Sequence, residues 1–135
     1  MKAQHLRIGN LVTWADQEDE SKAILTLTGI VLGDCIWLEW EWEDGKSDNT
    51  DCDLESIKPI PLTEEWLLNF GFEKSEISST IDSWHNHSMA VNTYSKSKVD
   101  YYWLRWYQHN KSSRIKYVHE LQNLYYALTK KELTL

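Results

Sequence analysis

The sequence predicts an α+β fold built from two parts, residues 1–61 and residues 62–135. Two observations lead to this prediction. Short runs of β-branched and aromatic residues, separated by glycine or polar turns, fill the first part and return in the second. Residues 116–128 then place apolar side chains at helical spacing, which is typical of a helix that packs on an antiparallel sheet.

The first part contains four or five predicted strands. Residues 23–32 are rich in β-branched residues and include Gly29, which predicts a strand with a bulge or bend. Residues 35–43 alternate in the manner of a half-buried strand, and Asp44-Gly45 predicts a hairpin turn after them. So many short strands in so few residues predict a small SH3-like β-barrel over residues 1–61. We expect three tryptophans to fill this barrel: Trp14, Trp40 and Trp42.

The second part begins with a short linking helix. Thr63 is placed to cap its start, and Gly71 is placed to end it. Four short segments then predict an antiparallel meander: residues 72–77, 80–84, 88–94 and 99–107. A closing helix over residues 116–128 is expected to cover this meander, giving an α+β subdomain over residues 62–135.

The charge is unevenly distributed along the chain. The net charge is −7, and residues 1–60 hold five basic and thirteen acidic residues, against nine basic and eight acidic in the rest. Direct nucleic-acid binding is disfavoured, because such affinity comes mostly from Lys and Arg that neutralise phosphates. An acidic first part fits a basic protein partner better.

Cysteines and apolar runs indicate the compartment. Cys35 and Cys52 have no CxxC or zinc-finger spacing, and no apolar run is long enough for a signal peptide or a membrane span. We therefore expect reduced thiols, no membrane association and a cytoplasmic location.

The common catalytic motifs are incomplete. His119-Glu120 lacks the second histidine of HExxH, because position 123 is Asn123. His85 and His87 lack a third ligand with matching spacing, which favours a solvated turn. No GxSxG elbow, GxGxxG loop or P-loop is present, and carboxylates near the cysteines would raise a thiol pKa. We expect neither an enzyme nor a cofactor or metal site.

One face of residues 35–43 is the first candidate for a binding surface. The alternation places an aromatic residue beside three carboxylates: Trp37, Glu39, Glu41 and Glu43. Five more carboxylates continue this row along the chain: Asp44, Asp48, Asp51, Asp53 and Glu55. Such a face can meet a protein partner, and a row of carboxylates can also mimic a nucleic-acid backbone. The competing interpretation is an exposed edge that charge keeps soluble.

A second candidate is a small-ligand site. Aromatic residues at positions 101–107 lie among basic residues, and such sets can stack nucleobases on a sheet. An aromatic cleft between the two parts could hold a signalling nucleotide, with Arg105, Lys116 or His119 binding its phosphate. The alternative is a core role, because alternation directs about half of these aromatic residues into the core.

Three blocks of sequence resemble a family of short proteins from phages, prophages and mobile elements of Bacteroidetes-type bacteria. They are residues 6–10 (LRIGN), 60–72 (IPLTEEWLLNFGF) and 116–129 (KYVHELQNLYYALT). The resemblance implies a small accessory protein of a mobile element, and it assigns no role to any individual residue. Such proteins often block or redirect host proteins, including immune ones.

These observations favour a non-catalytic binding module that acts on a host or phage protein partner. Counter-defence is one role that such a module could have. Two alternatives stay open: a protein that sequesters a small ligand or signalling nucleotide, and an acidic DNA-mimic inhibitor. A homodimer is compatible with all three.

Overall fold

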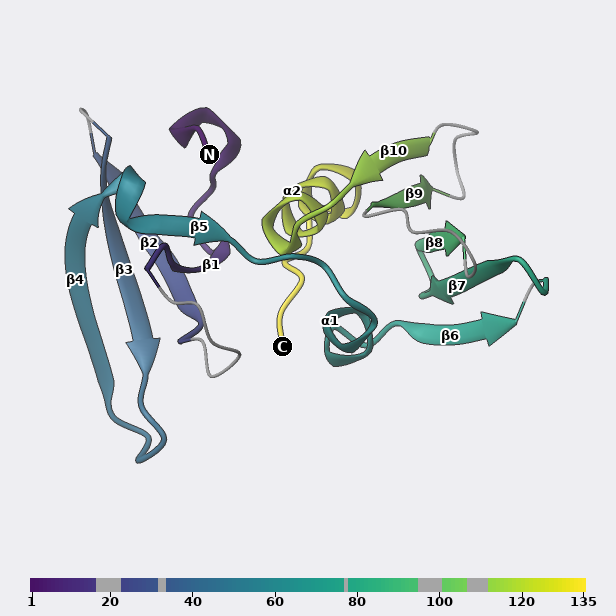
Figure 1. The fold of residues 1–135 in the computed structure, drawn as a ribbon, viewed down its shortest axis with the longest axis horizontal. Helices are drawn as coiled ribbons and strands as arrows, with labels where there is room; N and C mark the ends of the chain where they lie inside the picture. Colours follow the sequence, from purple (N-terminus) through teal and green to yellow (C-terminus); the bar gives the residue numbers. More distant parts are fainter. Residues whose placement is uncertain (17–22, 32–33, 77, 95–100, 107–111) are drawn as a thin grey trace. The chain divides into compact units, whose positions relative to one another are not determined.

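The computed structural model describes residues 1–16, 23–31, 34–76, 78–94, 101–106 and 112–135. Over these residues the chain is an α+β protein with two antiparallel five-stranded sheets and two α-helices (Figure 1). The predicted α+β class is therefore confirmed. The chain divides into two compact units. Unit 1 comprises residues 1–60 and 118–123, and unit 2 comprises residues 61–117 and 124–135.

Unit 1 contains a sheet with the strand order β4-β3-β2-β1-β5. Its strands are β1 (Leu11–Trp14), β2 (Leu25–Val31), β3 (Cys35–Glu41), β4 (Ser47–Asp53) and β5 (Ile57–Pro59). Two short 3-10 helices, η1 (Ala3–His5) and η2 (Leu54–Ser56), precede β1 and β5. Among the described residues β4 and β5 form the two edges, and no pairing joins them into a closed barrel.

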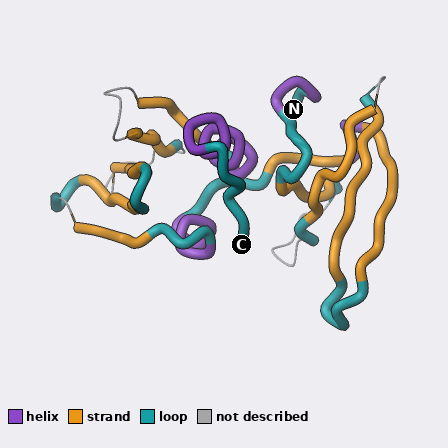
Figure 2. The backbone as a smooth tube through the Cα atoms, turned by 180° about the vertical axis from the view of Figure 1, so that it is seen from behind, coloured by secondary structure: helices purple, strands orange, loops and turns teal. Residues whose placement is uncertain are grey.

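In the hairpins of unit 1, glycine residues mark the bulge and the turn that the sequence predicts. Strands β2 and β3 pair through a register shift between Leu27 and Gly29, so the bulge predicted at Gly29 is confirmed. Strands β3 and β4 pair without a shift over their whole length, and they run side by side to their turn (Figure 2). Gly45 in that turn has a φ of +80°, a conformation that glycine adopts without strain. The hairpin predicted from Asp44-Gly45 is therefore confirmed.

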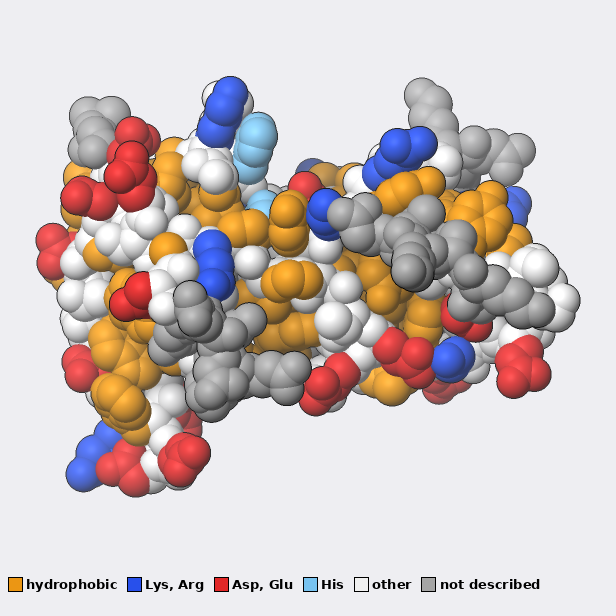
Figure 3. All heavy atoms as spheres, in the orientation of Figure 1, with side chains coloured by type: hydrophobic (Ala, Val, Ile, Leu, Met, Phe, Trp, Pro, Cys, Tyr) orange, Lys and Arg blue, Asp and Glu red, His pale blue; other side chains and the backbone are white. Residues whose placement is uncertain are grey.

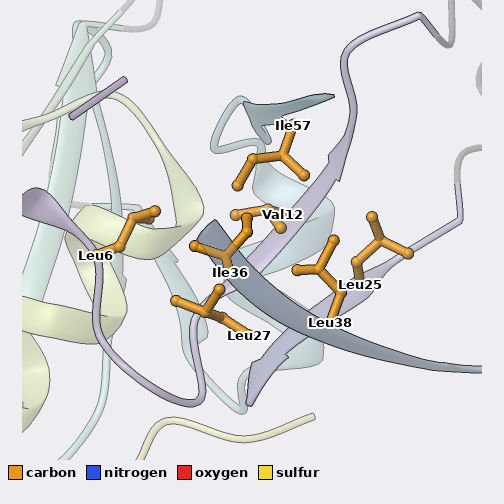
Figure 4. Close-up of a cluster of buried hydrophobic side chains, with 7 residues drawn as sticks. All are labelled: Leu6, Val12, Leu25, Leu27, Ile36, Leu38 and Ile57. Carbon is orange, nitrogen blue, oxygen red and sulfur yellow. The ribbon is translucent and has the colours of Figure 1, made fainter. Parts of the chain in front are cut away.

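The core of unit 1 is a cluster of aliphatic side chains (Figure 4). Its members are Leu6, Val12, Leu25, Leu27, Ile36, Leu38 and Ile57. Trp14 and Trp40 pack against it, with ring centroids 6.0 Å apart in an edge-to-face arrangement. The prediction that Trp42 also fills the interior is wrong, because its side chain is 55% exposed. Trp42 follows the last residue of β3, where strand alternation no longer directs side chains inward.

The first turns of helix α2 (Val118–Thr129) complete unit 1 through hydrogen bonds. The Leu11 amide donates to Gln122 Oε1 at 2.9 Å, and Gln122 Nε2 donates to the Gly9 carbonyl at 3.1 Å. Asn123 Oδ1 accepts a hydrogen bond from Asn10 Nδ2 at 2.8 Å. The polar side chains of α2 thus bind the backbone and side chains of the β1 region.

Unit 2 opens with helix α1 (Glu64–Asn69). Thr63 occupies the predicted N-cap position, but its side chain makes no capping hydrogen bond. Gly71 has a φ of +83°, and its amide donates to the Leu68 carbonyl at 2.9 Å. A glycine in this conformation is a common helix end, so the predicted stop at Gly71 is confirmed.

The second sheet has the strand order β10-β9-β8-β7-β6. Its strands are β6 (Glu73–Glu76), β7 (Ile81–His85), β8 (Met89–Tyr94), β9 (Tyr102–Trp106) and β10 (Ser112–Ile115). The first four correspond to the predicted meander, whose last segment is described only over residues 101–106. The prediction omits β10, because the sequence SSRI has no alternation of apolar side chains.

One face of the second sheet is apolar and buried. It carries Trp84, Met89, Val91, Leu104 and Ile115, all of which are 2% exposed or less. Trp84 contacts the edge of the Tyr102 ring at 5.8 Å between centroids. At the margin of this face, Lys74 pairs with Glu64 of α1 at 3.0 Å. The opposite face of the sheet carries the polar residues of the alternation.

Candidate functional site

Strand β3 brings three predicted partner-binding residues onto one face of the unit 1 sheet. Trp37, Glu39 and Glu41 alternate with the buried Ile36 and Leu38, so they point away from the core. Asp and Glu side chains gather along the margin formed by β3 and β4 (Figure 3).

The hairpin register adds two carboxylates from β4 to this surface. Asp51 lies directly opposite Trp37, and Asp53 lies opposite Cys35. Residues opposite each other in an antiparallel pair project to the same face. We use the term acidic face for Trp37, Glu39, Glu41, Asp51 and Asp53. All five side chains are exposed.

The indole of Trp37 is exposed and yet held in place. It is 44% exposed, and it lies over Gly29 of the neighbouring strand. A Cβ atom at Gly29 would lie only 3.2 Å from Trp37 Cδ1. The missing side chain of Gly29 therefore makes room for the indole, and one side of the ring rests on the sheet while the rest meets solvent.

Glu43, the fourth predicted partner-binding residue, lies beyond the end of β3 in the hairpin turn. It is exposed but does not belong to the alternating row. In the same turn Lys46 pairs with Asp44 at 3.2 Å, so this lysine binds turn residues rather than the acidic face. The sequence places Asp51 and Asp53 in the continuation of the acidic row, and the register of the hairpin brings these two onto the face of Trp37.

The residues of the predicted ligand site belong to both units. Arg105 is exposed on the second sheet, and Lys116 is exposed after β10, both in unit 2. His119 belongs to unit 1 and is only 4% exposed. Burial lowers its pKa, an effect that Glu120 opposes and that His5 and the N-terminal amine reinforce. A buried imidazole with a lowered pKa is poorly suited to bind a phosphate.

The two cysteines are free thiols on β3 and β4. Cys35 lies opposite Asp53, and Cys52 lies opposite Ile36, so the two thiols project to opposite faces of the hairpin. Burial raises the pKa of Cys52, and Cys35, Asp53 and Asp51 add to the rise. The direction agrees with the expectation that nearby carboxylates disfavour the thiolate.

At His85 and His87 the sequence favours a solvated turn over a metal site. In the described part of the chain, no three or more His, Cys, Asp or Glu side chains come together in a way that could hold a metal ion. His85 ends β7, and His87 is exposed in the turn after it.

The chain was compared with family models, curated proteins and solved structures. None matches. Neither described helix is both long and apolar enough to cross a membrane.

Proposed function

We propose that this chain is a non-catalytic binding module that presents the acidic face to a basic segment of a protein partner. One observation carries the proposal: an exposed tryptophan, held over Gly29, stands among four exposed carboxylates. Aromatic anchors surrounded by polar residues are typical of the energetic centre of protein interfaces.

The chemistry of the acidic face defines the partner. Lys and Arg are the side chains that Glu39, Glu41, Asp51 and Asp53 attract, and an Arg guanidinium can also stack on the Trp37 indole. The carboxylates would steer a basic partner towards the face, whereas burial of the indole would supply most of the affinity. Because one side of Trp37 already rests on Gly29, its immobilisation on binding costs little entropy.

The topology of unit 1 supports the SH3-like architecture that the sequence predicts. Five strands follow the order β4-β3-β2-β1-β5, and η2 connects the last two in sequence. We infer that β4, at the edge of this sheet, is the strand beside which the partner docks. The resemblance to mobile-element proteins suggests a partner from the bacterial host or from the phage.

Affinity capture from a bacterial lysate, followed by mass spectrometry, tests the proposal. The bait is the whole chain, and the comparison is between the wild type, Trp37→Ala and Trp42→Ala. Trp42 is the matched control, because it is more exposed than Trp37 but lies outside the acidic face. We expect a basic protein that the wild type and Trp42→Ala capture and Trp37→Ala does not. Equal capture by all three baits would contradict the proposal.

A further inference from the structure

On the polar face of the second sheet, side chains from four neighbouring strands lie next to one another. Ser83 of β7 lies opposite Asn92 of β8. On the next strand, Trp103 of β9 lies opposite Asn92 and also opposite Arg114 of β10. Arg105 follows Trp103 on the same face, two residues along β9. We use the term polar row for Ser83, Asn92, Trp103, Arg105 and Arg114.

Two members of the polar row are buried polar groups without a partner. Ser83 is 0% exposed and Asn92 is 8% exposed, and neither Ser83 Oγ nor Asn92 Oδ1 has a hydrogen-bond partner among the described residues. His85 Nδ1, on the same face of β7, is in the same condition. A buried polar atom without a partner destabilises a fold, and such groups often mark binding sites. Three such atoms on one face make this face a candidate for a ligand site.

Aromatic rings and cations border these buried groups. The Tyr94 and Trp103 rings lie 4.9 Å apart between centroids. The Arg114 guanidinium lies 4.7 Å from the centre of the Tyr101 ring. This cation–π contact keeps the positive charge of Arg114 close to Tyr101. Arg105 is exposed and lies opposite the small residue Ala90, so no bulky side chain blocks its approach from β8.

We propose that the polar row binds a mononucleotide that carries an adenine base. The base stacks on the ring of Trp103, and Asn92 forms hydrogen bonds with its amino group and ring nitrogen, a pairing that amide side chains make with adenine. Ser83 contributes a third hydrogen bond from the floor of the site. The guanidinium of Arg105 binds the phosphate, as arginine does in many phosphate sites.

The charge of the chain favours a mononucleotide over a polynucleotide. A long nucleic-acid strand needs several cations along its path, whereas the polar row supplies two arginines and the whole chain has a net charge of −7. Buried acceptors such as Asn92 Oδ1 also fit a small ligand that enters the face better than a strand that crosses it.

Titrations of the 15N-labelled full chain with adenosine 5′-monophosphate, adenosine and ribose 5-phosphate test this inference. We expect AMP to shift the amide signals of β7, β8 and β9 and to bind at least about tenfold more tightly than either fragment, because each fragment lacks one set of contacts. Equal binding of ribose 5-phosphate would show simple anion adsorption and overturn the proposal. Tighter binding of a single-stranded oligoadenylate, or no shift with AMP, would overturn it as well.

Two variants separate binding from folding. Arg105→Gln removes an exposed cation, and we expect it to weaken AMP binding about tenfold, whereas Lys131→Gln, an exposed control with the same loss of charge, does not. Ser83→Ala removes a buried hydroxyl without a partner, so we expect an unchanged or higher Tm together with weaker AMP binding. Unchanged AMP affinity in both Arg105→Gln and Ser83→Ala would overturn the proposal.

Discussion

The Trp37 indole occupies the space that a side chain at Gly29 would fill, with Trp37 Cδ1 3.2 Å from the position of the missing Cβ. The two residues lie opposite each other on β3 and β2, next to the bulge in β2. Gly29 thus has two roles in this sheet. It accommodates the register shift, and it provides the surface on which an exposed aromatic residue rests.

Gly29→Ala should displace the Trp37 indole. Gly29 does not have a positive φ, so alanine can adopt its backbone conformation, and the new Cβ is the source of the strain. We expect a loss of about 1 kcal/mol in the free energy of unfolding, measured by urea denaturation.

A double-mutant cycle isolates this contact. In a Trp37→Ala background the Cβ meets no indole, and alanine restricts the unfolded chain more than glycine does, so Gly29→Ala should be neutral or slightly stabilising. Thr28→Ala, an exposed change on the same strand, serves as the control. An equal cost of Gly29→Ala in both backgrounds would show that Trp37 does not depend on Gly29.

Gln122→Ala should destabilise unit 1 strongly. Gln122 is 3% exposed and binds the Leu11 amide and the Gly9 carbonyl, and both backbone groups would lose their partner. We expect a cost of about 3 kcal/mol in denaturant unfolding, against almost none for the exposed Gln4→Ala. If Gln122→Ala lowered the free energy of unfolding no more than Gln4→Ala does, these two hydrogen bonds would not hold α2 to β1.

His119 should make the stability of the chain fall in mild acid. Burial lowers its pKa in the folded state, so at pH values below the ordinary value of 6.5 the unfolded chain takes up a proton that the folded chain refuses. The contribution is fully present above that value and is lost as the pH falls towards the lowered pKa. We expect the Tm of the wild type to decline from about pH 7.5 to about pH 5.5 more steeply than that of His119→Gln. Parallel profiles would exclude His119 as the cause.

Cys52 should react slowly with alkylating agents. Its raised pKa keeps the thiol protonated at neutral pH, and only the thiolate is a nucleophile. In a Cys35→Ser variant we expect the rate of iodoacetamide modification of Cys52 at about pH 7.5 to lie below that of a free cysteine. The rate should increase when the pH is made alkaline, because the thiolate then forms. A rate equal to that of free cysteine would contradict the shielding by burial and by Asp51 and Asp53.

Local patterns in the sequence predicted much of the fold. The alternation of residues 35–41 placed Trp37, Glu39 and Glu41 on one face, because strand geometry leaves only two faces to choose from. Gly29 and Asp44-Gly45 predicted the bulge and the hairpin. Gly45 has a φ of +80°, which few residues other than glycine adopt, whereas Gly29 leaves room for the Trp37 side chain.

The remaining features depend on contacts distant in sequence. Trp42 has the same parity as Trp40 but lies past the end of the strand, and only the three-dimensional pairing shows where β3 ends. The position of Ser83 opposite Asn92, and of Asn92 opposite Trp103, depends on the register of three strands. Strand β10 forms because β9 pairs with it, and its own residues carry no strand pattern.

The association rate between the chain and its captured partner, measured by surface plasmon resonance at low and high salt, tests the central claim most directly. The account predicts that Glu39→Lys with Asp51→Lys lowers this rate at least about tenfold at low salt and that added salt removes the difference. Glu73→Lys with Glu132→Lys changes the net charge equally at exposed positions of unit 2, and it should have little effect. Equal rates for the two double variants at low salt would show that the acidic face is not the partner-binding surface.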